Sequence, residues 1–113
     1  MSESEAVEYE IRWAIDPDAA ALMGTDELRQ NFLVERLFER GSILLTYTHY
    51  DRMIVGGAMP DKGPLALSAI KPTGTAAFLD RRELIAVNVG GAGVVACGDE
   101  RFEAGPRDMV YLG

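Results

Sequence analysis

Short apolar runs, separated by glycine, proline and charged residues, dominate the chain beyond residue 41. They are rich in β-branched and aromatic residues, which is typical of strands. Residues 65–70 form a weaker run of the same kind. The regular spacing of strands and turns, without long helices between them, predicts an all-β fold, an antiparallel sandwich or barrel. The clear runs are residues 43–50, 53–59, 84–89, 94–97 and 109–112.

Residues 25–41 have the spacing of apolar residues expected for a helix, but they also contain a short β-prone run. Thr25 is a good N-cap, and the acidic residues that follow it favour the first turn of a helix. Apolar residues from Leu28 onward fit a short N-terminal helix that ends at Gly41. However, the run 32–34 is β-prone, so a shorter helix that passes into a strand near residue 33 is also allowed. Periodicity alone favours the longer helix.

The first 24 residues differ in charge from the rest of the chain. The formal charge is −7, and residues 1–18 hold six acids against one arginine, a net charge of −5. This segment is broken by Pro17 and then rich in alanine, which predicts a loosely attached acidic arm with one short helical turn. Residues 41–113 hold eight acids and seven bases, and their lysines and arginines form no continuous stripe that could neutralise phosphates. This distribution argues against nucleic acid as a partner.

Length and composition limit the class of protein. At 113 residues with 48% hydrophobic residues, the chain suits one globular domain with its own core. No apolar run approaches the roughly 18 residues of a bilayer-spanning helix, so we expect no membrane partner. The acidic N-terminus is unlike a signal peptide, and the single cysteine, Cys97, fits a reducing compartment, so we expect a cytoplasmic protein.

His49 is the only histidine and a candidate for a polar contact with a ligand. On strand 43–50 it shares a face with Ile43, Leu45 and Tyr47, which would point it into a barrel. Catalytic zinc usually takes three protein ligands, so one histidine makes a poor metal site. A hydrogen-bonded structural histidine is the competing interpretation. The sequence names no catalytic residue and no metal ligand.

Charged pairs near strand ends are candidates for binding a carboxylate, since arginine binds carboxylates through two hydrogen bonds. If a strand begins at Asp80, then Arg81 and Glu83 lie on one face of it. Arg52, beside Asp51 at a hairpin tip, is a second candidate for binding a carboxylate. The competing interpretations are a solvated strand entrance or subunit contact for the first pair, and a surface ion pair for the second. The glycine-rich segment 90–93 predicts a hairpin turn with positive φ.

The C-terminal third of the chain resembles half of a cupin barrel. The similarity lies in RRELIAVNVGGAGVV (81–95) followed by GDERFEAGPRDMVYLG (98–113). Metal-binding cupins carry an HxH pair four residues before a glutamate, and a third histidine later. Aligned on Glu83 and Gly105, these positions fall on Ala77, Leu79 and Asp108, none of which is histidine. The resemblance therefore implies a cupin-like partial barrel without a metal.

Four blocks resemble the N-terminal region of a narrower family, the 5-keto-4-deoxyuronate isomerases, or 4-deoxy-L-threo-5-hexosulose-uronate ketol-isomerases. The resemblance implies a strand over Leu33–Phe38, an arm over 1–24 and an N-terminal cupin-like domain over 25–113. It also implies that the family's zinc is held in a second cupin, so that this chain needs no cofactor. The blocks are LRQNFLVERLF (28–38), THYDRMIVGGAMP (48–60), FLDRRELIAVNVGGAGVV (78–95) and GPRDMVYLG (105–113).

Three hypotheses follow from this resemblance. In the first, the chain has a structural and assembly role in a homo-oligomeric ketol-isomerase of pectin and uronate degradation, without metal chemistry of its own. In the second, it is a non-catalytic module that binds a small uronate through Arg52 or Arg81. In the third, two chains complete each other's barrels and assemble a site from His49, Glu83 and Asp108.

Overall fold

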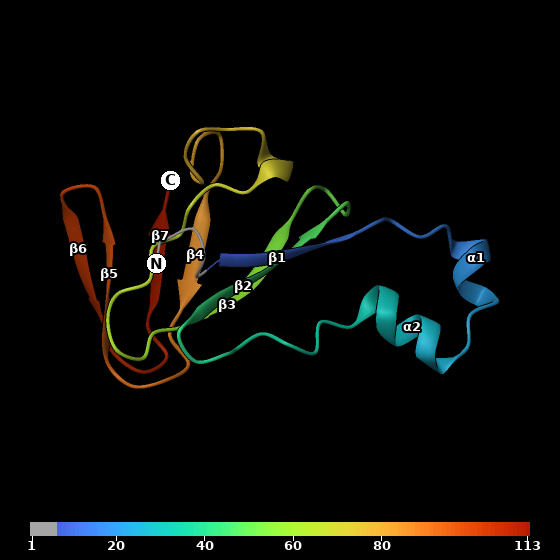
Figure 1. The fold of residues 1–113 in the computed structure, drawn as a ribbon, viewed down its shortest axis with the longest axis horizontal. Helices are drawn as coiled ribbons and strands as arrows, with labels where there is room; N and C mark the ends of the chain where they lie inside the picture. The colour runs from blue at the N-terminus through green and yellow to red at the C-terminus, as the bar shows by residue number, and fades with distance from the viewer. Residues whose placement is uncertain (1–6) are drawn as a thin grey trace. The chain divides into compact units, whose positions relative to one another are not determined.

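The computed structural model describes residues 7–113 and contains mostly strands, in small sheets, with few helices. The prediction of an all-β chain is confirmed at this level. The chain divides into two compact units, up to Gly74 and from Thr75 onward. The elements, in order, are β1 (Val7–Arg12), α1 (Pro17–Ala21), α2 (Thr25–Phe32), β2 (Ser42–Thr48), β3 (Ile54–Met59), the 3₁₀ helix η2 (Lys71–Thr73), β4 (Leu84–Val87), β5 (Gly93–Cys97), β6 (Glu100–Ala104) and β7 (Met109–Leu112) (Figure 1).

The first unit is built on a three-stranded sheet in the order β1-β2-β3. β2 is its core, with every residue from Ile43 to Tyr47 buried. β3 is antiparallel to β2, but β1 is parallel to it, so the prediction of a purely antiparallel sheet is wrong here. Parallel neighbours need a long crossover, and the segment 13–41 with its two helices provides one.

β1 also corrects the expectation of a loosely attached arm. Residues 7–12 pair with β2 along its whole length, from Val7 opposite Ile43 to Arg12 opposite Thr48. The physical reason is an alternation of apolar and charged residues with a period of two, which suits a strand. The expected helical turn is present as α1.

Residues 25–41 follow neither of the two sequence-based predictions to the end. The helix α2 stops at Phe32, and Leu33 is extended, with φ −109° and ψ 131°. The segment 33–39 is then neither helix nor hydrogen-bonded strand. Gly57 of β3 shows the reason, since a Cβ added there would meet the carbonyl oxygen of Leu37 and lie 2.8 Å from the ring of Phe38. The segment therefore packs closely against β3 at Gly57, where the absence of a side chain makes room for it, and it does not pair with the edge of a strand.

The weak strand predicted over 65–70 is absent. Residues 65–69 are half-buried and Ile70 is buried, but none of them belongs to a strand. This run lies between Pro64 and Pro72, and a proline restricts the residue before it and donates no hydrogen bond to a ladder. Burial of its apolar side chains accounts for the hydrophobic pattern.

The second unit contains two antiparallel ladders, β4 with β7 and β5 with β6. A tight turn joins β5 to β6, and Gly98 adopts φ +58° in it. The predicted hairpin at 90–93 is wrong, because β4 and β5 belong to different ladders and none of its glycines has positive φ. The ladders match strand runs expected from the sequence, but a cupin barrel is not established by them.

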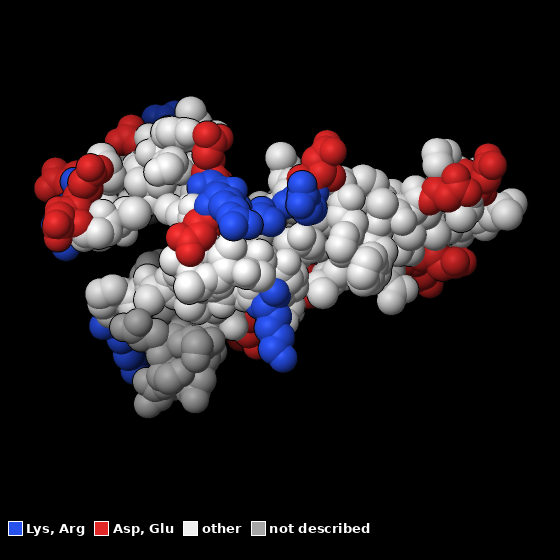
Figure 2. All heavy atoms as spheres, turned by 90° about the horizontal axis from the view of Figure 1, so that it is seen from above, with Lys and Arg blue, Asp and Glu red and all other residues white. Residues whose placement is uncertain are grey.

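Acidic side chains gather over the two helices of the first unit (Figure 2). Asp18 lies in the first turn of α1, and Asp26 and Glu27 lie in that of α2, where they interact favourably with the helix dipole. Cys97 is a free, exposed cysteine. Within residues 7–113, no helix has the length and apolar character needed to cross a membrane.

Candidate functional site

One face of the first unit's sheet is polar where β1 and β2 meet. The parallel register pairs Glu10 with Thr46 and Arg12 with Thr48. Side chains two residues apart on a strand share a face, so all four lie on the same side of the sheet. Thr46 is nevertheless buried, at 4% exposure, because further chain covers this face.

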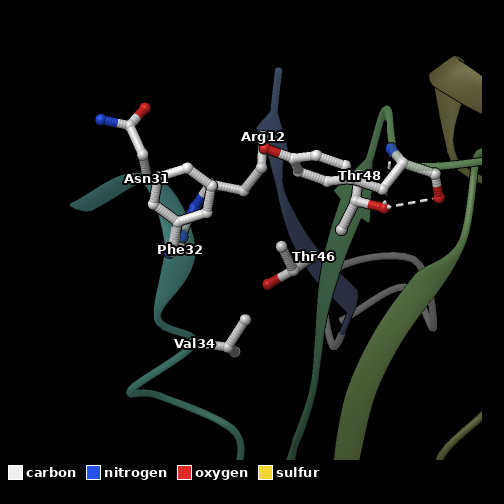
Figure 3. A pocket seen from close by; sticks show the side chains of 7 residues that line it. Arg12, Asn31, Phe32, Val34, Thr46 and Thr48 are labelled. Carbon is white, nitrogen blue, oxygen red and sulfur yellow. Dashed lines mark hydrogen bonds between the residues drawn. The ribbon is translucent and has the colours of Figure 1, made fainter. Parts of the chain in front are cut away.

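A pocket of about 330 Å³ lies over this polar face (Figure 3). Arg12, Thr46 and Thr48 line it from the sheet, and Phe32 and Val34 line it from the end of α2 and the segment after it. Figure 3 shows Arg12 reaching from β1 toward Phe32, with Thr46 and Val34 below them. The pocket thus has a polar floor and an apolar wall.

The guanidinium of Arg12 contacts Glu10 through two of its nitrogens, while its third nitrogen has no hydrogen-bond partner among the described residues. Its Nε donates to Glu10 Oε1 at 3.0 Å, and its Nη2 lies 2.6 Å from the same oxygen. The side chain of Arg12 is only 17% exposed. Its Nη1 is buried and has no hydrogen-bond partner among the described residues. A buried cationic donor without an acceptor is costly, so this contact with Glu10 alone leaves the guanidinium partly unsatisfied.

Two hydroxyl groups add polar character to the pocket lining. Thr46 Oγ1 lies 3.4 Å from Glu10 Oε1, a long contact for a hydroxyl donor. The Tyr50 hydroxyl accepts a hydrogen bond from the backbone N–H of Ile15 at 3.0 Å, which leaves its own proton to donate. Thr48, by contrast, donates to the Met53 carbonyl at 2.8 Å.

The amide of Asn31 contributes less than its position in the lining suggests. Its Nδ2 donates to the carbonyl of Glu27 at 2.8 Å and contacts Met23 Sδ at 3.8 Å. Figure 3 shows this amide turned away from the other lining side chains. The polar chemistry of the pocket is therefore that of a guanidinium with hydroxyl groups.

His49 follows the last residue of β2 and packs between two aromatic rings. Its ring stacks on Trp13 at a centroid distance of 4.0 Å, with an angle of 4° between the planes. Tyr47 meets it edge-on at 5.3 Å. The backbone N–H of His49 donates to the Arg12 carbonyl at 2.9 Å, which extends the pairing of β1 with β2. His49 does not line the pocket.

The two arginine candidates both lie in turns. Asp51 and Arg52 have positive φ, 54° and 56°, at the tip between β2 and β3. Arg81 also has positive φ, 64°, in a turn closed by the N–H of Arg82 donating to the carbonyl of Leu79 at 3.1 Å. β4 begins only at Leu84, so the premise that a strand places Arg81 and Glu83 on one face is wrong.

The other two candidates, Glu83 and Asp108, take local partners in the second unit. The hydroxyl of Tyr111 donates to Glu83, and this hydrogen bond, together with the charge of Glu83, raises the pKa of Tyr111 above its ordinary value. Asp108 Oδ2 accepts from the N–H of Gly105 at 2.8 Å, which fixes the turn before β7. Both carboxylates therefore have structural contacts, and a role in ligand binding stays a prediction.

Residues 7–113 do not offer a donor set for a zinc ion of the kind that the family resemblance implies for a second cupin. Among residues 7–113, no three side chains of His, Cys, Asp or Glu come close enough together to hold a metal ion. The one histidine of the chain is stacked on Trp13. Protein zinc sites need three or four such ligands around one point. We therefore derive no step through a metal from these residues.

Sequence reasoning missed the residue that stands out in this unit, Arg12. A signal was present in VEYEIR, since alternation with a period of two puts Glu10 and Arg12 on one face. What the pattern could not give was the parallel partner strand, and hence the threonines beneath them. It also could not show that residues at the end of α2 and just after it form the wall of a pocket over this face.

Comparison with known proteins bears on the family resemblance. The chain is 62% identical over 107 residues to 4-deoxy-L-threo-5-hexosulose-uronate ketol-isomerase 2 of Rhizobium meliloti, a match that covers 95% of this chain. It is 55% identical over 103 residues to the ketol-isomerase of the same name from Cereibacter sphaeroides, and 46% identical over 104 residues to that of Agrobacterium fabrum. The chain is homologous to the N-terminal part of these ketol-isomerases.

The homology covers nearly all of this chain but a minority of its relatives. The chain spans 38% of the length of each of these uronate ketol-isomerases. No family model matches it. The resemblance stated from the four sequence blocks is thus confirmed, whereas the activity printed in the names of the relatives belongs to proteins of greater length.

Proposed function

We propose that this chain is the N-terminal portion of a 4-deoxy-L-threo-5-hexosulose-uronate ketol-isomerase of uronate degradation, in which it serves structure and assembly. Identity of 46 to 62% over more than nine tenths of the chain supports the reaction class. The donor set described above supports a role without metal chemistry of its own.

One observation carries the assembly role, the exposed apolar face of the β4–β7 ladder. The register places Ile85 opposite Tyr111 and Val87 opposite Met109, on one face. These four side chains are 52 to 69% exposed. On the other face, Val110 is buried and Leu84 is half-buried. The ladder is therefore covered on one side and apolar on the side that faces solvent.

A two-stranded ladder is marginal in water unless further strands or a packed surface support it. Contiguous exposed apolar side chains usually mark a surface that contacts another protein. The proposed occupant is a second copy of this chain, which brings the same apolar face and needs no further component.

The assembly role is tested by sedimentation velocity of the chain over a range of concentrations. We expect self-association, and we expect the double variant Val87→Thr/Met109→Thr to shift the chain to monomer with unchanged circular dichroism. A matched control, Val94→Thr/Cys97→Ser, alters exposed residues of the neighbouring ladder β5–β6 and should leave association unchanged. A chain that stays monomeric at all concentrations would contradict the assembly role.

The catalytic side is tested by elemental analysis and by turnover of the uronate substrate. We expect the chain alone to hold no stoichiometric zinc and to give no product. Mixing it with the separately expressed remainder of the Rhizobium meliloti relative should restore turnover. Stoichiometric zinc that is lost in His49→Ala would contradict the proposal and support a metal site assembled between subunits from His49, Glu83 and Asp108.

A further inference from the structure

We infer that the outer edge of β3 is a second self-association surface, at which β3 of one copy pairs antiparallel with β3 of another. This inference rests on the assembly role proposed above, because it describes how copies already joined through the β4–β7 ladder associate further. It concerns the other unit of the chain and the backbone of a strand edge, whereas the first contact is an apolar face.

β3 is an edge strand whose outer backbone groups have no partner strand. In the sheet order β1-β2-β3, only one side of β3 faces β2 (Figure 1). The N–H of Thr48 donates to the Met53 carbonyl at 3.0 Å, and with the antiparallel register this turns the odd-numbered residues of β3 toward β2. The backbone groups of Ile54, Gly56 and Ala58 therefore point away from β2. No hydrogen bond joins them to another described residue.

The two edges of this sheet differ in how well they discourage pairing with another chain. Natural edge strands avoid such pairing with charged residues, proline or bulges. β1, the edge on the other side, reads VEYEIR and carries a charge at every second residue. β3 reads IVGGAM and has neither a charge nor a proline. The sequence of β1 thus protects its edge, whereas that of β3 leaves its edge suited to accept a strand.

The side chains of β3 favour a second copy of the same strand as the partner. Antiparallel pairing through the outward backbone groups, centred on Gly56, brings Ile54 opposite the partner's Ala58. It also brings Val55 opposite the partner's Gly57. Each large side chain therefore faces a small one, and the paired strands carry no charge to repel each other. This complementarity is a property of the strand with itself, so the proposed occupant is a second copy.

The β3 contact depends for its strength on the contact through the β4–β7 ladder. Backbone hydrogen bonds at an edge replace bonds to water, so one pairing gains little, and a lone pair of strands is marginal. Two copies joined through the ladder present two β3 edges. Binding through both makes the second pairing intramolecular, at a high effective concentration. We therefore expect larger assemblies from joined copies, and monomers when the ladder contact is removed.

The test combines sedimentation velocity of the 113-residue chain with residue-resolved hydrogen exchange. We expect species larger than a dimer, in which the amides of Ile54, Gly56 and Ala58 exchange at least about tenfold more slowly than in Val87→Thr/Met109→Thr. A dimer as the largest species would overturn this inference and leave the assembly role standing, whereas a monomer at all concentrations would overturn both. Larger species in which the three amides exchange as in the double variant would also overturn the inference.

Two variants of β3 locate the contact. Ala58→Pro removes an outward N–H and leaves the hydrogen bonds to β2 in place, so it should reduce the chain to a dimer. Val55→Lys brings a positive charge of each copy close to that of the other, and should do the same with unchanged circular dichroism. It keeps the test decisive if Ala58→Pro does not fold.

The matched control, Tyr9→Lys, puts the same charge on the other edge strand. Tyr9 is 41% exposed and Val55 is 39% exposed, so the two substitutions disturb packing to a similar degree. Tyr9→Lys should assemble like the unaltered chain. Larger species that persist in Val55→Lys, or that are lost in Tyr9→Lys, would contradict pairing at the β3 edge.

Discussion

Each of the two units of this chain is stabilised internally by a different kind of interaction. In the first unit, five consecutive residues of β2, from Ile43 to Tyr47, are buried beneath chain on both faces of the sheet. In the second unit, no strand has two consecutive buried residues, and apolar side chains of β4 and β7 remain exposed. Apolar burial therefore stabilises the first unit far more than the second.

A polar residue compensates in part for this difference in the second unit. Asn88 Nδ2 donates to the carbonyl oxygens of Gly91 and Ala104, both at 2.9 Å, and of Gly105 at 3.2 Å. Its Oδ1 accepts from the N–H of Gly90 at 3.0 Å. One side chain thus links the end of β4 to the loops before β5 and after β6. The comparison shows that a small sheet can be organised around one amide when its apolar faces are not both covered.

The largest expected effect comes from removing apolar volume in β2. Ile43 is 5% exposed, and Ile43→Ala should lower the free energy of unfolding of the first unit by about 2 to 4 kcal/mol, because it loses burial and leaves a cavity. Trp13, the only tryptophan, stacks on His49 in this unit and reports its unfolding by fluorescence in a denaturant titration.

The matched control removes the same atoms from the second unit. Ile85 is 65% exposed, so Ile85→Ala should change the stability of the monomeric chain, at concentrations below those at which it self-associates, by less than about 0.5 kcal/mol. Hydrogen exchange of the β4 and β7 amides measures this. A cost at Ile85 equal to that at Ile43 in the monomeric chain would mean that the exposed apolar face is covered by the chain itself, and would abolish the contrast between the units.

The second prediction removes the amide network. Asn88→Ala should destabilise the second unit by about 2 kcal/mol, since three carbonyl oxygens lose a donor. Asn88→Asp keeps the shape but puts a carboxylate against those carbonyls, and should cost at least as much. Faster hydrogen exchange confined to residues 84–112, with the amides of β2 unchanged, is the expected result. Equal acceleration in β2 would show that the two units unfold together.

Much of this fold was predictable because its strands carry strong local signals. β3, β4 and β7 lie within runs that the sequence marks as strands, and β2 overlaps such a run from Ile43 to Thr48. The failures were cases in which a distant contact decides the local structure. Gly57 lets residues 37 and 38 lie close to β3, and nothing in the sequence of 33–41 itself shows this.

The candidate site was harder to predict for a related reason. Arg12 stands in a segment whose acidity suggests an exposed arm, and only pairing with β2 places it over Thr46. Likewise, Asn88 lies in a run that predicts a longer strand, but its side chain bonds to carbonyls as far as residue 105. Charge and periodicity are local properties, whereas these roles depend on residues 16 to 36 positions away along the chain.

The smallest expected effect concerns the edge of the second unit's apolar face, where Tyr111 donates to Glu83. This hydrogen bond exists only while the phenol is protonated, and the carboxylate repels the phenolate, so the pKa of Tyr111 is raised. A raised pKa in the folded state adds stability at pH values below the ordinary tyrosine pKa, and this contribution is lost as the pH rises through the raised pKa. Because Tyr111 is exposed, the gain is small.

Glu83→Gln should move the pKa of Tyr111 back toward its ordinary value, because the amide carries no charge and accepts more weakly. NMR titration of the tyrosine ring carbons separates Tyr111 from the other three tyrosines, which serve as internal references. Glu100→Gln, on the neighbouring ladder, is the matched control and should leave the titration of Tyr111 unchanged. If Glu83→Gln has no effect either, the Tyr111 hydroxyl is not bonded to Glu83 in solution, and this edge of the ladder is free to rearrange when a second copy covers the apolar face.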